Sequence, residues 1–381
     1  MLAKVLEEKL EKRTEDGTKR RLRNVPEGHV DLSSNDYLGL IQSGKIDAVL
    51  RSRLAQAESL AGSGGSRLIS GETDTVTHFE QYLCEFYNVE ATLTFTSGYD
   101  ANLALIGALG NLGEVVFLYD ELIHASMRDG FRLSRARSHH FRHNDLEDLE
   151  TKLSQADKKP IVFVESIYSM DGDSSDFREL INLVKKYDGE IIVDEAHSSA
   201  IHGERGEGLI SELGFANEIF ARVHTWGKAH GAQGAVICGS ELLKEYLVNF
   251  GRPFIYTTGV SSLLLHAARA SYEVVKAANE ERAQLKRNIE FFNALSDETS
   301  IGFSRNNSPI QTLKLDRASN SPAKIRELAA KLRSNELYVV PIFHPTVPEG
   351  EERIRISLHT FNSEEEIRTL FQVIEGELGQ K

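Results

Sequence analysis

The chain has 381 residues, with 57 acidic and 44 basic side chains, so its formal net charge is −13. A negative balance of this size argues against a nucleic-acid-binding protein, which normally presents a basic surface to phosphates. The chain is 40% hydrophobic and 27% charged, as expected for a globular protein. Its two cysteines, Cys84 and Cys238, provide neither a disulfide framework nor a CxxC metal or redox pair.

The first residues, 1–23, lack the apolar core of a signal peptide, and no run of about 18 apolar residues occurs in the sequence. We therefore expect a cytoplasmic protein with no membrane partner, and the scarcity of cysteine fits a reducing compartment. Apolar residues at helical spacing predict an amphipathic first helix that ends in a basic cluster. That cluster contains Lys19, Arg20, Arg21 and Arg23.

Short apolar runs alternate with helical patterns through the middle of the chain. Continuously apolar strands separated by helices are typical of a mainly parallel sheet that is covered on both faces. A mostly helical stretch, Ser261 to Leu295, follows these runs. The predicted strands are Ala91–Phe95, Val115–Tyr119, Ile161–Val164, Ile191–Val193, Ala221–His224 and Gly234–Cys238.

The C-terminal part has a different pattern, which predicts a smaller α/β domain. Its last strand places Arg353, Arg355 and Ser357 on one face, as in a half-buried strand. We expect three parts: an N-terminal segment (1–45), a large α/β domain (46–275) and a small C-terminal α/β domain (276–381). The predicted elements of the last part are strands Ile310–Leu315, Tyr338–Ile342 and Arg353–Leu358, and helices Pro322–Ser334 and Ser363–Leu378.

In open parallel sheets, ligands bind beyond the carboxyl ends of the strands. The strand Ala91–Phe95 is followed by the polar turn Thr96–Asn102, which leads into a helix. Free backbone N–H groups at such a helix start form a phosphate site. An ordinary strand-to-helix turn is the alternative, because the single Gly98 is a weaker indication than a phosphate-loop signature.

Four further side chains follow predicted strands. Asp194 and His197 come after Ile191–Val193, where a buried aspartate needs a cationic partner and an exposed loop pair is the alternative. Lys228 lies among small residues and is suited to a Schiff base, although most lysines are solvated. His124 either stacks on a planar ligand or caps the next helix.

Several competing sites are disfavoured by the motifs present. The run Gly62–Arg67 is neither a Walker loop nor a dinucleotide fingerprint. His139, His140 and His143 lack the HExxH pattern and have no cysteine nearby, so we expect no metal site. The missing GxSxG elbow argues against an α/β-hydrolase.

A planar aldehyde that carries a phosphate group would bind to all of the remaining candidate residues. The helix start would hold its phosphate, Lys228 its aldehyde, Asp194 a protonated ring nitrogen and His124 the ring face. Pyridoxal phosphate is such a molecule.

The chain resembles the α-oxoamine synthases, which are fold-type I pyridoxal-phosphate enzymes, from about Leu6 to the last helix. Within that family, the chain most resembles the branch that condenses L-alanine with a pimeloyl thioester of coenzyme A or a carrier protein, with loss of carbon dioxide, in biotin synthesis. The SNDYLG motif is shared with the branch that makes 5-aminolevulinate, which the compact N-terminus disfavours. The motifs that carry the resemblance are Ser34–Gly39 (SNDYLG), Gly62–Arg67 (GSGGSR), Thr96–Tyr99 (TSGY), Glu165–Asp173 (ESIYSMDGD), Asp194–His197 (DEAH), Gly227–Ala229 (GKA) and Pro345–Pro348 (PTVP).

The resemblance implies a role for each candidate site residue. Lys228 carries the cofactor and then acts as a general base, Asp194 pairs with the pyridine nitrogen, and His197 contacts the ring 3-oxygen. His124 covers the ring face, and because the family's sites lie at a subunit interface, a homodimer is implied. The other implied contacts are Ser97, Gly98, Tyr99, Ser169, Thr225 and a second subunit's Thr257 or Thr258 for the cofactor, Asn35 and Arg355 for the amino acid, and Arg20 and Arg21 for the acyl chain.

Three positions depart from the family pattern. Ser198-Ser199-Ala200 stands where Gly-Thr-Gly is common, which affects the backbone beside the ring. Phe343-His344 precedes Pro345 where some relatives have an arginine, and the cluster at Arg20 and Arg21 matches the acyl-recognition region only loosely.

Other functions compete with this interpretation. A family member that uses glycine or serine with a different acyl-CoA is the main alternative. A non-catalytic partner subunit would be expected to lose the Schiff-base lysine, and a nicotinamide dehydrogenase is disfavoured by the missing GxGxxG. Arg353 and Arg355 are alternatively a pair of solvated arginines on an edge strand.

Overall fold

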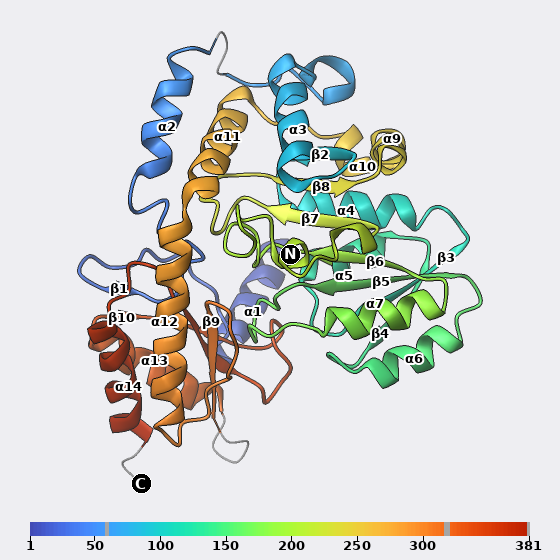
Figure 1. Cartoon of the computed structure of the whole chain (residues 1–381). Helices are drawn as coiled ribbons and strands as arrows, with labels where there is room; N and C mark the ends of the chain where they lie inside the picture. Colours follow the sequence, from blue (N-terminus) through green and yellow to red (C-terminus); the bar gives the residue numbers. More distant parts are fainter. Residues whose placement is uncertain (58–60, 316–320, 379–381) are drawn as a thin grey trace. The chain divides into compact units, whose positions relative to one another are not determined.

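The computed structural model describes residues 1–57, 61–315 and 321–378 and divides into two compact units (Figure 1). The larger unit contains Asn35–Ser169 and Asp173–Ala283, and the smaller contains Met1–Ser34, Met170–Gly172 and Gln284–Lys381. The three-part division at residues 45 and 275 stays a prediction. Among the described residues, no helix combines the length and apolar character that a membrane crossing requires.

In the part of the larger unit that the structure describes, seven strands form one sheet, in the order β2-β8-β7-β6-β5-β3-β4. The pairs from β7 through β4 are parallel, whereas β8 is antiparallel to both of its neighbours. The predicted mainly parallel sheet is confirmed. Its strands are β2 (Ala91–Phe95), β3 (Val115–Asp120), β4 (Arg137–Phe141), β5 (Lys159–Glu165), β6 (Glu190–Asp194), β7 (Ala221–Thr225) and β8 (Ala235–Gly239).

Helices cover both faces of this sheet. Successive residues of a strand point to opposite sides of the sheet, so neighbouring residues pack against different helices. Phe117 and Phe163 pack with residues of α4 and α5, whereas Leu118 and Val162 pack with residues of α6 and α7. The helices and short helical turns of this unit are α2 (Lys45–Leu54), η1 (Arg67–Gly71), α3 (Asp74–Tyr87), α4 (Gly98–Leu109), α5 (Ala125–Leu133), α6 (Leu146–Ser154), α7 (Phe177–Lys186), α8 (Leu209–Glu212), η2 (Ala216–Glu218), α9 (Glu241–Phe250), α10 (Arg252–Ile255) and α11 (Ser262–Ala277).

The edge strand β4 was not predicted from the sequence, and among the described residues it pairs with β3 alone. Its sequence, Arg-Ser-His-His-Phe, has one buried residue, Phe141. An edge strand with a solvated face lacks the apolar run by which the interior strands were predicted.

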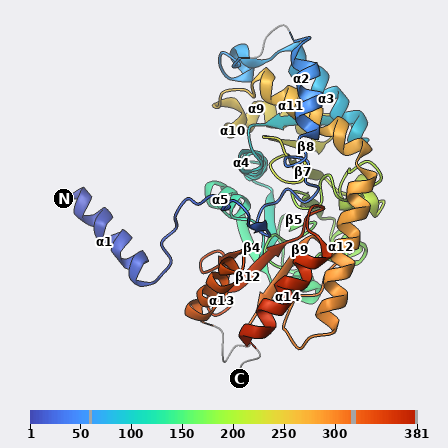
Figure 2. The ribbon, with the colours of Figure 1, turned by 90° about the vertical axis from the view of Figure 1, so that its left-hand side faces the viewer.

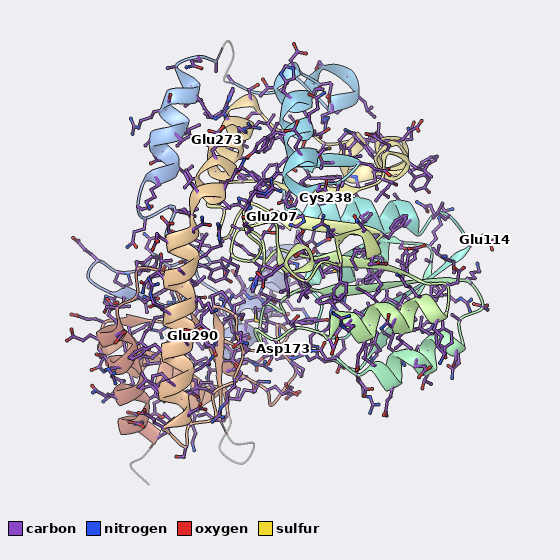
Figure 3. All side chains as sticks on the ribbon, in the orientation of Figure 1. Glu114, Asp173, Glu207, Cys238, Glu273 and Glu290 are labelled. Atoms are coloured by element: carbon purple, nitrogen blue, oxygen red, sulfur yellow. The ribbon has the colours of Figure 1, made fainter. Side chains whose placement is uncertain are left out.

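The free thiols Cys84 and Cys238 belong to α3 and β8, and Figure 3 labels Cys238.

The smaller unit contains a three-stranded antiparallel sheet, β11-β12-β9, and a parallel pair, β1-β10. The predicted strand Tyr338–Ile342 is in fact two strands, which pair with β1 and β12 respectively. The strands are β1 (Val30–Asp31), β9 (Ile310–Lys314), β10 (Leu337–Tyr338), β11 (Val340–Ile342) and β12 (Arg353–Ser357), and the helices are α1 (Leu2–Glu15), α13 (Pro322–Ser334) and α14 (Glu364–Leu378). Another helix, α12 (Asn279–Asp297), begins in the larger unit and continues in this one.

The first helix ends earlier than its sequence pattern predicts. It stops at Glu15, ahead of the basic cluster, and Gly17 follows in a left-handed conformation with φ of 64°. Glycine adopts this conformation without steric cost and commonly ends a helix. No residue of α1 is buried, and Figure 2 shows the helix at the end of an extended segment.

The environment of Arg353 and Arg355 excludes the interpretation that they are solvated side chains on an edge strand. Their strand, β12, is the central one of three, and the exposed fractions of Arg353 and Arg355 are 1% and 8%. Arg353 forms ion pairs with Asp171 and Glu351, and Arg355 donates from Nη1 to the Ser357 hydroxyl at 2.8 Å. Both guanidinium groups therefore have fixed surroundings.

Candidate active site

A cavity of about 320 Å³ lies in the larger unit, where β2, β5, β6 and β7 end. Its described lining does not include Ser169, Thr257 or Thr258, and Arg355, Arg20 and Arg21 belong to the smaller unit. The candidate residues that do line it are Asn35, Ser97, Gly98, Tyr99, His124, Asp194, His197, Thr225 and Lys228.

One wall of the cavity is the start of α4, which begins at Gly98, inside the predicted turn Thr96–Asn102. The Ser97 hydroxyl caps the helix by accepting from the backbone N–H of Asp100 at 3.1 Å. A Cβ atom on Gly98 would lie 2.4 Å from Cγ2 of Thr225, so the close approach of β7 requires glycine here. The first backbone N–H groups of a helix are suited to an anion.

Asp194 ends β6 and is buried, with an exposed fraction of 5%. It accepts hydrogen bonds from Asn102 Nδ2 at 2.8 Å and from the backbone N–H of Ala196 at 2.9 Å. Both donors are neutral amides, and Lys228 is a cationic side chain that lines the same cavity. His197 is equally buried at 5%, so the exposed-loop alternative for this pair is wrong.

His197 is oriented by two residues of the SNDYLG motif. The Tyr37 hydroxyl lies 2.8 Å from His197 Nδ1 and donates to Asn35 Oδ1 at 2.9 Å. Because the hydroxyl has one proton to give, this arrangement favours the tautomer with hydrogen on Nδ1 of His197.

His124 lines the cavity and also caps α5, so the capping interpretation is confirmed. Its Nδ1 accepts from the backbone N–H of Ser126 at 3.2 Å and lies 2.8 Å from that residue's hydroxyl. Burial lowers the pKa of the imidazole below its ordinary value, Asp194 opposes this effect, and the Lys228 charge adds to it. A neutral ring results at neutral pH.

Glu165 is a site residue to which the sequence analysis gave no role. It ends β5, is in register with Asp194 and accepts the backbone N–H of His124 at 2.5 Å. Burial raises the pKa of its carboxyl to about 8, and the Asp194 charge contributes to the rise. An acidic residue at the end of an apolar strand is the same pattern that identified Asp194, and it applies equally to Glu165.

The loop Ser198–Ala200, which departs from the family pattern, is fixed by hydrogen bonds to buried residues. Ala200 adopts a left-handed conformation, with φ of 72°, where glycine is common. Ser198 donates to Glu195 Oε2 at 2.9 Å, and the Ser199 hydroxyl lies 2.8 Å from His224 Nδ1. These contacts fix the backbone after His197 although the glycines are missing.

A second cavity, of about 1010 Å³, lies in the smaller unit and is rich in basic groups. Burial and the charge of Arg23 lower the pKa of Arg333. Of the described residues that line it, none is acidic, and Phe343 and His344 are among them. An anion would relieve the repulsion between these cations. The basic residues are Arg13, Lys19, Arg20, Arg21, Arg23, Arg326 and Arg333.

The chemistry of the first cavity fits a group with an aldehyde, a cationic ring nitrogen and a phosphate. Lys228, Asp194 and the start of α4 supply the three complementary groups, and the buried Thr225 hydroxyl has no hydrogen-bond partner among the described residues. No cluster of three His, Cys, Asp or Glu side chains suited to a metal ion occurs in the described part of the chain.

Comparison with known proteins finds similarity over nearly the whole chain. The model of the family "Aminotransferase class I and II" matches residues 27–374. An 8-amino-7-oxononanoate synthase from Emericella nidulans is 34% identical, covering 97% of this chain and 94% of its own length. The synthase of that name from Cupriavidus necator is 35% identical, covering 93% and 89%.

The chain is also similar to solved structures of two differently named enzymes. The 8-amino-7-oxononanoate synthase of Francisella tularensis has a TM-score of 0.79 and 29% identity, covering 93% of this chain and 99% of its own. A serine palmitoyltransferase from S. paucimobilis with bound PLP has a TM-score of 0.87 and 26% identity, covering 99% and 98%.

The buried Glu165 carboxyl generates a prediction about stability. Because its folded-state pKa of about 8 exceeds the ordinary value of 4.5, the free energy of unfolding should fall as pH rises between these values. Glu165→Gln keeps an acceptor for the His124 N–H and does not titrate. We expect urea unfolding of the cofactor-free variant to show a weaker loss of stability from about pH 5 to about pH 9 than the parent.

The matched control for this experiment is Glu114→Gln, which changes an exposed glutamate just before β3 (Figure 3). It should reproduce the parent's pH dependence. Parallel curves for Glu165→Gln and the parent would show that Glu165 does not titrate with a raised pKa.

Proposed function

The chain belongs to the aminotransferase class I and II family, and we propose that it condenses L-alanine with a pimeloyl thioester to give 8-amino-7-oxononanoate, a step of biotin synthesis. The observation that carries the proposal is the grouping of Lys228, buried Asp194 and the start of α4 around one cavity. The two 8-amino-7-oxononanoate synthases that cover most of the chain supply the choice of reaction.

The cofactor is pyridoxal 5′-phosphate, which when bound withdraws electrons from Cα of the amino acid. Lys228 Nζ would hold its aldehyde carbon, and the N–H groups of Gly98 and Tyr99 would hold its phosphate. Asp194 would keep a proton on the ring nitrogen, because a buried carboxylate stabilises a nearby cation. These assignments use residues that line the cavity.

The chain's own groups then move protons and orient the substrate. Lys228 Nζ, when not bound to the cofactor, would take the proton from Cα of L-alanine as a general base. His124 would cover the ring face, and His197, oriented by Tyr37, would contact the ring 3-oxygen. A bond forms between Cα and the acyl carbon, the thiol of coenzyme A or a carrier protein leaves, and the α-carboxylate leaves as carbon dioxide.

Contacts outside the first cavity complete the proposal. Ser169 would lie near the cofactor, and Thr257 or Thr258 would reach the phosphate from a second copy of the chain, so the enzyme would act as a homodimer. Asn35 and Arg355 would bind the amino acid. The basic cavity supports Arg20 and Arg21 as partners of the acyl chain's terminal carboxylate or ester. We assign the reaction to the cytoplasm, in keeping with the two free thiols.

Another acyltransferase of the same family, using serine or glycine with a different acyl-CoA, is the alternative. The similarity to serine palmitoyltransferase in structure, with a TM-score of 0.87, favours it. The seven basic groups of the second cavity oppose it, because an unfunctionalised fatty chain would leave them without an anion. Lys228 argues against a non-catalytic subunit.

The substrate assignment is tested by a panel of L-alanine, glycine and L-serine against pimeloyl, acetyl, succinyl and palmitoyl thioesters. We expect L-alanine with the pimeloyl donor to give the highest kcat/KM, with thiol release and 8-amino-7-oxononanoate detected by mass spectrometry. Lys228→Ala is the control and should abolish turnover. A preference for serine with palmitoyl, or for glycine, would overturn the assignment.

Arg355 should bind the α-carboxylate of the amino acid through its planar guanidinium group. Arg355→Lys keeps the charge but loses the paired hydrogen bonds, so we expect the KM for L-alanine to rise by a factor corresponding to about 1.5 to 3 kcal/mol. The affinity for the cofactor should not change.

Arg353 is unsuitable as the control for this test because it is buried in an ion pair with Asp171. Arg305→Lys changes an exposed arginine of the same unit and should leave the KM unaltered. An unchanged KM in Arg355→Lys would remove Arg355 from the amino-acid site.

A further inference from the structure

His143 bridges two carboxylates in the larger unit. Its Nδ1 lies 2.9 and 3.0 Å from the two carboxylate oxygens of Asp120, and its Nε2 lies 2.7 Å from Oδ2 of Asp173. Asp120 is fully buried, and the His143 side chain is 20% exposed. Figure 3 labels Asp173 in the segment that follows β5.

The bridge requires a doubly protonated imidazole. Carboxylate oxygens only accept hydrogen bonds, so each ring nitrogen of His143 must carry a hydrogen to satisfy its partner. Burial lowers the pKa of His143, but the two carboxylates outweigh it and raise the pKa to about 10. The ring of Tyr168 packs edge-on against that of His143, with 4.5 Å between the ring centroids, and Asn144 Nδ2 lies 3.2 Å from His143 Nε2. Glu121 accepts the backbone N–H of His143.

Asp120 connects the bridge to the turn that carries His124. Its Oδ1 accepts the backbone N–H of Leu122 at 2.8 Å, and its carbonyl accepts that of Ile123 at 3.2 Å. The next residue is His124, whose own N–H is bound by Glu165. The turn before His124 is therefore held at its start by Asp120 and at its end by Glu165.

Asp173 connects the bridge to the segment after β5. The Asp173 carbonyl accepts the backbone N–H of Tyr168 at 2.9 Å, and its carboxylate accepts from Asn144 Nδ2 at 2.9 Å. The same Asn144 donates its backbone N–H to Asp120 Oδ2 at 2.9 Å. His143 and Asn144 thus join the segments that follow β3 and β5.

We propose that His143 is a positioning residue for the condensation, whose bridge between Asp120 and Asp173 fixes the turn that aims the His124 ring. The proposal rests on the proposed function, in which His124 covers the cofactor ring. A buried ion pair adds little net stability compared with a well-packed apolar cluster. Its directional hydrogen bonds fix geometry, and a displacement of about 1 Å in a catalytic group costs about a hundredfold in rate.

The test uses the double variant His143→Gln/Asp173→Asn. The single change His143→Gln leaves two carboxylates facing each other, which can prevent folding, whereas the double variant removes one cation and one anion together. We expect a folded protein that binds the cofactor, with kcat lowered by about ten- to a hundredfold. The KM for L-alanine should stay within about threefold, because no proposed amino-acid contact changes.

A second measurement does not depend on turnover. Imidazole ¹H–¹⁵N spectra of the cofactor-free parent should show hydrogen on both nitrogens of His143 at neutral pH and one sharp set of His124 signals. In the double variant the His124 signals should shift or broaden through exchange. His202→Gln, which removes another histidine–carboxylate pair of the same unit, is the control and should change neither kcat nor the His124 signals.

The outcomes separate this proposal from the proposed function. An inactive parent enzyme would contradict the function, while the spectra would still test the bridge. A folded double variant with parental kcat and unchanged His124 signals would overturn the positioning role. Failure of the double variant to fold would also overturn it, because the bridge would then be a requirement for folding.

Discussion

The burial of two adjacent carboxylates at the end of the central sheet governs the chemistry of this protein. Parallel pairing of β5 and β6 puts Glu165 and Asp194 in register, where both are nearly excluded from solvent. Two like charges in a medium of low dielectric constant cannot both persist without compensation. Burial and the Asp194 charge raise the pKa of Glu165, and in the proposed function the Asp194 carboxylate pairs with the protonated ring nitrogen of the cofactor.

The same constraint explains other buried charges. His143 is cationic because Asp120 and Asp173 enclose it, and Arg353 is buried because it pairs with Asp171. Asp171 and Asp173 belong to one short motif, residues 165–173, which also contains Glu165 and Ser169. This single segment therefore supplies three carboxylates with different surroundings. Glu165 lines the first cavity, Asp171 pairs with Arg353, and Asp173 pairs with His143.

The parts of the fold that follow local patterns were predictable from the sequence. Apolar runs gave the interior strands, and the turn Thr96–Asn102 gave the start of α4. The edge strand β4 was missed because its residues are mostly solvated, and one predicted strand proved to be β10 and β11 because pairing partners are a tertiary property. The fully buried state of Arg353 also depends on a residue distant in sequence, Asp171.

The candidate site was predictable where a residue's position at a strand end coincided with a family motif. Asp194, His197 and Lys228 satisfy both conditions and line one cavity. The strand-end pattern that identified Asp194 also indicates Glu165, but the hydrogen-bond partners of Glu165 and His143 depend on which carboxylates or N–H groups the fold brings within hydrogen-bond distance. No single-sequence pattern contains that information.

The most direct test of the account is chemical trapping of the lysine that holds the cofactor. The purified protein, loaded with pyridoxal phosphate, is reduced with borohydride, digested and mapped by mass spectrometry. The account predicts a pyridoxyl group on Lys228, beside the buried Asp194. A label on another lysine, or no label at all, would contradict it.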